Sequence, residues 1–400
     1  MNVTNNQLPK KERFDLPEGV IYLDGNSLGP LPKGAAERAR ETITEEWGTQ
    51  LIRAWNTAGW ISLPQRVGDR IGRLIGAPAG TVATGDTLSI KVYQALAAAL
   101  KMRPDRKVVL SDNGNFPSDL YMVQGLLDTV GGGYQLRTPA PQEVADAIDE
   151  TVAVVLLTQV DYRSGRVHDM REITRKAHQA GAVMIWDLAH SAGALPVDIE
   201  GCNAEFAVGC TYKYLNGGPG APAFIYVRPD VISDVRPALA GWMGHEAPFA
   251  MELGYRPAMS TERLRVGTPP IIQLAVLDAA LDAWEGVDMQ EIRSTSIELS
   301  ELFIAEVEAR CPQLTLASPR DPKARGSQVS FAFDNGYAAM QALIDRGVIG
   351  DFRAPDIMRF GFTPLYIDKA DVRKAAAVVE DVISSGAWRA PKYNVRSRVT

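Results

Sequence analysis

Apolar runs of three to six residues recur through the middle of the chain, separated by longer stretches in which apolar positions follow helical spacing. The runs are rich in Val and Ile and contain almost no polar residues, which is typical of strands buried on both faces of a sheet. Helices are expected between them at 118–129 and 171–180, the second ended by Gly181. The expected strands are residues 108–110, 152–157, 183–186, 206–210 and 224–227.

This alternation predicts βαβ units, and therefore an α/β fold with a mostly parallel sheet between two layers of helices. The pattern changes after residue 270, where longer helical stretches and a single strand indicate a smaller α+β domain. The elements expected there are helices at 271–284, 289–310 and 370–384 and a strand at 328–333.

Three parts of the chain are therefore expected: an N-terminal segment (1–55), a large domain (56–275) and a small C-terminal domain (276–400). The N-terminal segment contains an expected helix from Gly34 to about Ile52 and shows no strand neighbour of its own. We expect this segment to pack on the small domain or on a second subunit.

Composition and charge narrow the function classes. The chain has 400 residues, of which 46% are hydrophobic and 22% charged, as in ordinary folded proteins. Its net charge of −6 gives no positive surface for nucleic acid or anionic lipid, so an anionic ligand needs local positive charge. Three cysteines without a CxxC pattern predict neither disulfides nor a zinc site, and no metal is expected. The polar N-terminus and the lack of a membrane-length apolar run predict a cytoplasmic protein.

Two of the expected strands end in residues that suit a pyridinium cofactor. Asp187 follows the run 183–186 and Lys213 follows the run 206–210, and open α/β sheets bind ligands at the carboxyl ends of their strands. Alone, Asp187 is better explained as a helix cap, and Lys213 could be a lysine at a sheet edge. Together they match pyridoxal 5′-phosphate, which needs an amine to form an imine and a carboxylate to keep the ring nitrogen protonated.

A phosphate group needs hydrogen-bond donors. Residues 84–89, rich in Thr and Ser, precede an expected helix at 90–100. The free N–H groups of a helix N-terminus bind anions, although ordinary Ser or Thr capping is the alternative explanation.

Seven short motifs then resemble those of the kynureninase family. Gly-Asn-Ser-Leu-Gly stands at 25–29 and Phe-Pro-Ser-Asp at 116–119. A single motif would be weak, but seven in the family's order, from about Tyr22 to Tyr366, are specific. The remaining five stand at 187–190, 212–216, 241–245, 265–270 and 359–366.

The resemblance implies a fold type I pyridoxal-phosphate enzyme, with a mostly parallel seven-stranded sheet sandwiched by helices and a smaller α+β C-terminal domain. It implies hydrolysis of L-kynurenine to anthranilate and L-alanine by cleavage of the Cβ–Cγ bond, a reaction of tryptophan catabolism and NAD biosynthesis. It also implies a homodimer with its active site at the subunit interface.

Site residues follow from the same resemblance. Lys213 carries the cofactor, Asp187 pairs with the ring nitrogen, and Tyr212 is a candidate acid–base group at the substrate ketone, with a bound water as the alternative. Arg359 holds the substrate carboxylate, with Asn26 and Ser27 beside the substrate. The other cofactor contacts are assigned to Leu88, Ser89, Phe116, Asp119, Thr158, His190, Trp242 and Thr268.

Alternatives and departures remain at several of these positions. Phe116 could be a core residue, His190 a buried structural histidine and Arg359 a surface arginine. The phosphate segment reads Asp-Thr-Leu-Ser-Ile-Lys at 86–91, where bacterial relatives more often show Thr-Ser-Val-Asn. The loop at 218–220 is Gly-Pro-Gly, where relatives often have Ala or Ser. The small Gly267-Thr268 pair favours kynurenine over its 3-hydroxy analogue.

Other functions fit the same fold. A cysteine desulfurase needs a mobile nucleophilic cysteine, which Cys311, directly before Pro312, suits poorly. An aminotransferase remains open, and a cofactor-free binding protein has no need of an imine-forming lysine.

Overall fold

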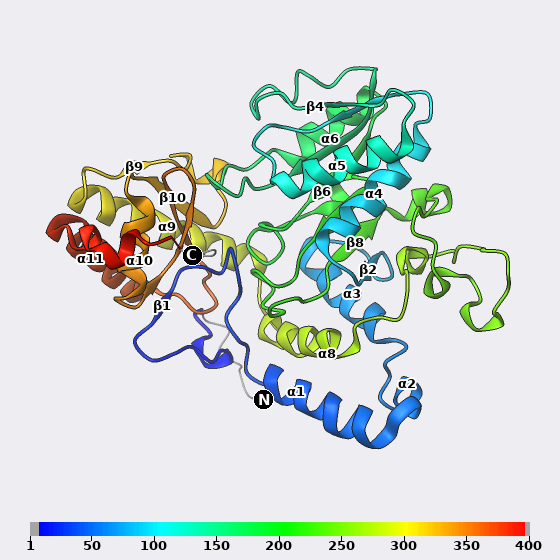
Figure 1. The fold of residues 1–400 in the computed structure, drawn as a ribbon, viewed down its shortest axis with the longest axis horizontal. Helices are drawn as coiled ribbons and strands as arrows, with labels where there is room; N and C mark the ends of the chain where they lie inside the picture. Colours follow the sequence, from blue (N-terminus) through cyan, green and yellow to red (C-terminus); the bar gives the residue numbers. More distant parts are fainter. Residues whose placement is uncertain (1–7, 397–400) are drawn as a thin grey trace.

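The computed structural model describes residues 8–396 (Figure 1). The expected N-terminal segment and C-terminal domain extend beyond it, since residues 1–7 and 397–400 lie outside the described residues. Figure 1 shows two bodies side by side, one around a large sheet and one containing the C-terminal helices. The expected boundary at residues 275 and 276 falls within the helix Ile271–Ala280, and the division into domains stays a prediction.

The large sheet has seven strands, as expected. Only β8 runs antiparallel to its neighbours, β2 and β7, and the other pairs are parallel. The predicted α/β class and mostly parallel sheet are therefore confirmed. The strand order is β2 (Val82–Thr84), β8 (Phe224–Val227), β7 (Phe206–Gly209), β6 (Val183–Asp187), β5 (Val152–Thr158), β3 (Val108–Leu110) and β4 (Gln135–Arg137).

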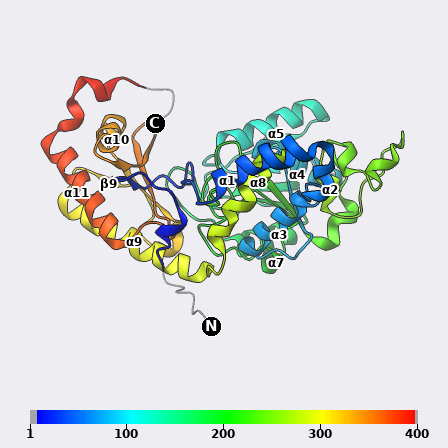
Figure 2. The same cartoon turned by 90° about the horizontal axis from the view of Figure 1, so that it is seen from below.

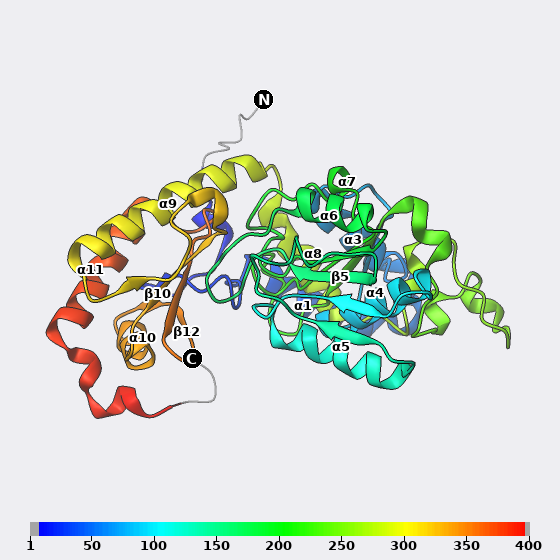
Figure 3. The ribbon, with the colours of Figure 1, turned by 90° about the horizontal axis from the view of Figure 1, so that it is seen from above.

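Both faces of this sheet are covered, because its central strands β5 and β6 are apolar up to their last residues, Thr158 and Asp187. Side chains alternate along a strand, so Leu156 and Ile185 join one hydrophobic cluster while Leu157 and Trp186 join another. Figure 3 shows the two helical layers. One layer contains α4 (Leu88–Met102) and α5 (Pro117–Val130); the other contains α3 (Leu63–Ile75), α6 (Met170–Gln179), α7 (Ile199–Cys202) and α8 (Ile271–Ala280).

The small sheet is antiparallel and has one apolar face and one polar face. Val329, Phe331 and Phe360 point to one side, where Phe360 packs against Phe303 of α9 with ring centroids 4.9 Å apart. Positions between them are polar and include Ser330 and Arg359, which stand opposite each other in register. The strand order is β12 (Asp351–Arg353), β13 (Ile357–Gly361), β10 (Gln328–Ala332) and β9 (Thr315–Leu316), with helices α9 (Met289–Arg310), α10 (Gly336–Ile344) and α11 (Lys369–Ser385).

The N-terminal segment does have a strand partner, so the expectation that it has none was wrong. Strand β1 (Ile21–Tyr22) pairs in parallel with β11 (Val348–Ile349). Two residues are too short a run for periodicity to reveal a strand. A long helical stretch follows, which lies along the lower edge in Figure 1 and runs across the large body in Figure 2. It is formed by α1 (Ala35–Glu41), the π-helix η2 (Thr42–Gln50), η3 (Leu51–Arg53) and α2 (Ala54–Thr57).

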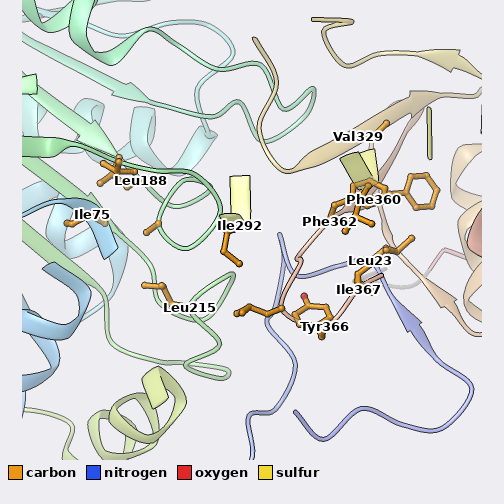
Figure 4. Close-up of a cluster of buried hydrophobic side chains, with 14 of the residues drawn as sticks. Leu23, Ile75, Leu188, Leu215, Ile292, Val329, Phe360, Phe362, Tyr366 and Ile367 are labelled. Atoms are coloured by element: carbon orange, nitrogen blue, oxygen red, sulfur yellow. The ribbon is translucent and has the colours of Figure 1, made fainter. Parts of the chain in front are cut away.

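Apolar contacts join the two bodies. One hydrophobic cluster includes Leu188 and Leu215 from loops of the large sheet, Phe362 and Tyr366 from beyond β13, and Leu23 from the N-terminal segment (Figure 4). Three distant parts of the sequence therefore pack together beside the strand ends of the large sheet.

Within residues 8–396, no helix is both long and apolar enough to cross a membrane. The same residues contain no group of three or more His, Cys, Asp or Glu side chains arranged to hold a metal ion.

Candidate active site

Lys213 lies in the loop that follows β7, and its side chain is half-buried. The N-terminal segment covers this loop, because Gly29 N–H donates to the Tyr212 carbonyl at 2.8 Å. A Cβ at Gly29 would lie 2.4 Å from the Lys213 carbonyl oxygen, so no larger residue fits. The first family motif is thus placed directly against the lysine loop.

Asp187 ends β6 and stands beside Thr158 in register on β5. Its Oδ1 accepts from Ala189 N–H at 2.8 Å, and the Thr158 hydroxyl lies 3.3 Å from its Oδ2. Burial raises the pKa of Asp187 to about 6, while the charge of Lys213 opposes that rise. Asp187 Oδ1 therefore caps the following turn, as the helix-cap explanation proposed. Its Oδ2 is held beside the Thr158 hydroxyl.

Asp119 of α5 belongs to the same cluster. It is buried, and among the described residues its Oδ2 has no hydrogen-bond partner. Burial, and then the charge of Asp187, raise the pKa of Asp119 well above its usual range. Asp119 therefore holds a proton more readily than an exposed carboxyl group does, which favours negative charge at Asp187.

Phe116 is an exposed ring above this cluster, so the alternative of a core residue was wrong. Its side chain is 44% exposed and packs edge-on against Tyr162, with centroids 5.1 Å apart. Asn115 fixes the position, since its Oδ1 accepts from Phe116 N–H at 2.7 Å and from the Thr158 hydroxyl at 2.5 Å. A ring exposed to this extent can stack on a flat heterocycle.

His190 follows Asp187 by three residues and is buried. Its Nδ1 lies 3.2 Å from Gln328 Oε1 on β10. Burial, and then the charge of Lys213, lower the pKa of His190 well below its usual range. A neutral imidazole thus joins the large sheet's site to the small sheet.

The first turn of α4 is open to an anion. Its N-cap, Thr87, makes no side-chain capping hydrogen bond, so the alternative of ordinary Ser or Thr capping was wrong. The N–H groups of Leu88 and Ser89 begin this helix, and Ser89 Oγ lies 3.0 Å from Ser118 Oγ. Free N–H groups and the helix dipole favour a phosphate here.

The unusual Lys91 of the phosphate segment is fully buried one turn further along α4. Its ammonium donates to Asp86 at 3.1 Å, to Gln94 at 3.0 Å and to the Leu264 carbonyl at 3.2 Å. Lys91 therefore ties the turn before α4 to the segment that leads to residues 265–270.

Arg359 on β13 is 1% exposed, so it is not a surface arginine. Its Nε donates to Asp351 Oδ1 at 2.6 Å, and its Nη2 donates to Asp351 Oδ2 and to Ser27 Oγ, the latter at 3.0 Å. Its Nη1 donates to the backbone carbonyl of Tyr162. Three distant segments thus converge on this guanidinium.

Asn26 is also fully buried, and within residues 8–396 neither of its amide atoms has a hydrogen-bond partner. A Cβ at Gly361 would lie 2.2 Å from Asn26 Oδ1, so this glycine allows the N-terminal segment to approach β13. Buried, unpaired amide atoms at this position suit a bound polar group.

Two expected cofactor contacts lie apart from this group. Trp242 is 40% exposed and packs edge-on against Phe249 with centroids 5.8 Å apart, and Thr268 is exposed. Neither makes a hydrogen bond, ion pair or ring contact with Lys213 or Asp187 in the part of the chain described.

Burial, and then Cys210, raise the pKa of Tyr212, so its phenol stays protonated beside Lys213.

Asn115, Tyr162, Gln328 and Asp351 were not predicted as site residues. Asn115 could have been suspected from its place directly before the 116–119 motif. Tyr162 acts through its backbone carbonyl, and Gln328 and Asp351 act through partners more than a hundred residues away, His190 and Ser27.

Known proteins resemble this chain both in sequence and in fold. A family model for the kynureninase C-terminal domain matches residues 292–379. A kynureninase of Burkholderia pseudomallei (strain 1106a) is 50% identical over 399 residues, which cover 98% of this chain and 96% of that protein. The chain belongs to the kynureninase family. A kynureninase of Pseudomonas fluorescens, also a member, is 49% identical over the same length.

Solved structures place the kynureninase fold among pyridoxal-phosphate enzymes. An apo cysteine desulfurase from Thermococcus onnurineus NA1 has a TM-score of 0.80 at 20% identity and covers 95% of this chain and 99% of its own. C-DES with glycine covalently linked to its PLP cofactor has a TM-score of 0.81 at 19% identity, covering 93% and 99%. At such identities the likeness shows the fold alone, and it confirms fold type I.

The residues present fit the cofactor of the kynureninase family. An amine at Lys213, a buried carboxylate at Asp187 and an open helix N-terminus at Leu88 supply what an aldehyde, a pyridine nitrogen and a phosphate require. The orphaned Oδ2 of Asp119 lies in the same buried cluster. Pyridoxal 5′-phosphate is therefore the cofactor that this site accommodates.

Proposed function

We propose that the chain hydrolyses L-kynurenine to anthranilate and L-alanine, with pyridoxal 5′-phosphate held at Lys213. The observation that supports this most is the pairing of a half-buried Lys213 with a buried Asp187 at neighbouring strand ends, in a chain 50% identical to a kynureninase. We assign the reaction to tryptophan catabolism, which also feeds NAD biosynthesis, in the cytoplasm.

The bound cofactor supplies an electron sink for the substrate's Cα. Asp187, buried beside Asp119, would keep a proton on the ring nitrogen. The free amine of Lys213 would take up the Cα proton, and its flexible four-carbon stem suits that transfer. The Tyr212 phenol, which stays protonated, can donate to the ketone oxygen of the substrate when water adds there.

We assign the remaining site residues to binding the cofactor and the substrate. Phe116 would stack on the ring, while Thr158 and His190 complete its edge. Leu88 and Ser89 would donate to the phosphate through the first turn of α4. Asn26, Ser27 and Arg359 would hold the amino-acid end of the substrate.

Cysteine desulfurase activity is disfavoured despite the shared fold. Cys311 is fully buried directly after α9, and burial raises the pKa of its thiol to about 11. A protonated, enclosed thiol is a poor nucleophile.

We further propose a C2 homodimer that completes the site. The N-terminal helical stretch exposes Ile43, Trp47, Leu51 and Ile52, between 42% and 77% of each side chain. Trp242 and Thr268, exposed in the single chain, would then reach the phosphate of the partner's site. Light scattering that gives a fully active monomer would contradict the dimer.

A product assay tests the function itself. Purified holoenzyme given L-kynurenine should release anthranilate and L-alanine in equal amounts, and Lys213→Ala should release neither. We expect a lower kcat/KM for 3-hydroxykynurenine, because Gly267 and Thr268 offer no large polar side chain to its ring hydroxyl. Transfer of the amino group to the cofactor without carbon–carbon cleavage would instead assign aminotransferase activity.

A further inference from the structure

A second arginine shares the face of the small sheet that carries Arg359. Asp351 stands directly opposite Arg359 in the β12–β13 register, and Arg353 lies two residues from Asp351 along the same strand. Side chains two apart on a strand share a face, so Asp351, Arg353 and Arg359 project together. Phe352 and Met358, on the opposite face, belong to the hydrophobic core.

The hydrogen-bonding capacity of Arg359 is almost used up. A guanidinium has five N–H groups. In this structure four donate: two to Asp351, one to Ser27 and one to the Tyr162 carbonyl. The edge that normally grips a carboxylate in bidentate fashion, Nε with Nη2, is filled by Asp351. Arg359 therefore holds a fixed position in the site, but Asp351 already balances its positive charge.

Arg353 is differently placed. Its Nη2 contacts Asp351 at 2.7 Å and its Nη1 donates to the Phe352 carbonyl at 3.2 Å. Among the described residues no second acid lies within ion-pair distance, and a third of the side chain (34%) remains exposed. Three of its N–H groups are thus available to a ligand.

The charge of Arg353 reaches the reaction site. It is among the charges that act on the buried groups Tyr212 and His190, which flank Lys213 and Asp187 in the sequence. Burial, and then the charge of Arg359, lower the pKa of Arg353, which is typical of a cation whose charge is incompletely balanced. This is the physical condition under which an incoming anion is stabilised.

The charged groups on this face have a net positive charge that one bound anion would balance. Arg353 and Arg359 contribute two positive charges and Asp351 one negative charge. Asp24, the remaining acid that acts on both arginines, is buried, and burial followed by the charge of Asp351 raises its pKa to about 7. Below about pH 7, where Asp24 is mostly protonated, the cluster has a net charge of about +1, which one carboxylate would neutralise.

We propose that Arg353 is the second cation of the substrate's carboxylate site: Arg359, fixed by Asp351 and Ser27, orients the carboxylate, and Arg353 supplies the uncompensated positive charge. The proposal rests on the proposed amino-acid substrate. It makes Arg353 a binding residue that recognises the carboxylate and leaves recognition of the amine to the cofactor.

Equilibrium titration of the holoenzyme tests this without turnover. L-alanine and ethylamine differ by the carboxylate, and both are followed by the change in cofactor absorbance. Arg353→Gln should weaken L-alanine binding about tenfold or more, as for a lost charge-assisted hydrogen bond, and change ethylamine binding less than about twofold. Arg353→Lys, which keeps the charge, should retain most of the affinity for L-alanine.

Arg346→Gln is the matched control. Arg346 lies in the small domain, is exposed to a similar extent (32%) and forms one ion pair, with Asp381 at 3.1 Å. Unchanged L-alanine binding in Arg353→Gln would overturn the proposal. So would equal weakening of both ligands, or equal weakening in Arg346→Gln. Should the wild type bind L-alanine in this way but release no anthranilate from kynurenine, the proposed reaction fails while the carboxylate site stands.

Discussion

His190 and Gln328 join the two sheets through one hydrogen bond of 3.2 Å. Gln328 Nε2 donates to the Tyr162 carbonyl, so its Oε1 is the acceptor, and His190 must donate from Nδ1. The neutral imidazole therefore keeps an unprotonated Nε2 that can accept a hydrogen bond.

This tautomer can be measured. With four histidines in the chain, ¹⁵N spectra of the protein should contain one imidazole protonated at Nδ1 that does not titrate between about pH 5 and 8, because its pKa is well below the usual range. The signal should vanish in His190→Gln. A His190 signal that titrates near pH 6.5 would contradict the buried, neutral state.

Lys213 should be the point of cofactor attachment. Borohydride reduction of the holoenzyme followed by peptide mapping should place the cofactor on Lys213. Lys91, the fully buried lysine beneath the phosphate turn, should remain unmodified, because its ammonium is tied to Asp86 and Gln94. Modification of Lys91 or another lysine would show that the site is assigned wrongly.

Replacing Asp187 should impair chemistry more than folding. Asp187→Asn keeps the shape and can still accept from Ala189 N–H, but it cannot keep the ring nitrogen protonated, so kcat/KM should fall by about two orders of magnitude or more. Asp169, which caps α6 by accepting from Glu172 N–H at 2.9 Å, gives the control. Asp169→Asn should leave kcat/KM near its starting value. Comparable activity in both variants would reduce Asp187 to a helix cap.

Removing Arg359 should affect both binding and stability. Arg359→Ala takes away a carboxylate ligand and leaves Asp351 buried, with Arg353 at 2.7 Å and the Ser27 hydroxyl at 2.7 Å as its remaining partners. We expect KM for kynurenine to rise at least tenfold and the free energy of unfolding to fall by about 3 kcal/mol, the lower end of the range for a broken buried pair. Steady-state kinetics and urea unfolding measure the two effects. An unchanged KM would assign the carboxylate to another cation.

Asp24 should make stability depend on pH. Its folded pKa of about 7 lies above the ordinary value of 3.8. The stabilisation from its bound proton is therefore complete below about pH 4 and lost as pH rises through 7. Asp24→Asn cannot lose that proton, so the Tm difference, variant minus wild type, should increase between pH 5.5 and pH 8.5. A difference that stays constant over this range would show that Asp24 is ionised throughout.

Much of the fold could be predicted from strands buried on both faces. Runs such as 152–157 are continuously apolar because helices cover both sides, and Asp187 and Lys213 stand out as the polar groups that end such runs. Strands of two or three residues, such as β1 and β12, are too short for a two-residue period to be seen.

The predicted site was incomplete for a related reason. Arg359 could be found in its motif, but its partner Asp351 lies across a hairpin and Tyr162 contributes a backbone carbonyl. A carbonyl has no residue type, so sequence cannot indicate it. Trp242 and Thr268 are exposed in the single chain, and their sequence motifs do not indicate which groups contact them.

The pairing of β1 with β11 sets an order of events on the ribosome. Ile21 and Tyr22 leave the exit tunnel early, while Val348 and Ile349 follow more than 300 residues later. At ordinary translation speeds this delay is roughly 15 to 65 seconds, long enough for the large sheet to form. Throughout that time Gly29 has not been fixed over the lysine loop by the strand pairing that anchors its segment. The catalytic centre is therefore finished last, after nearly the whole polypeptide has been made.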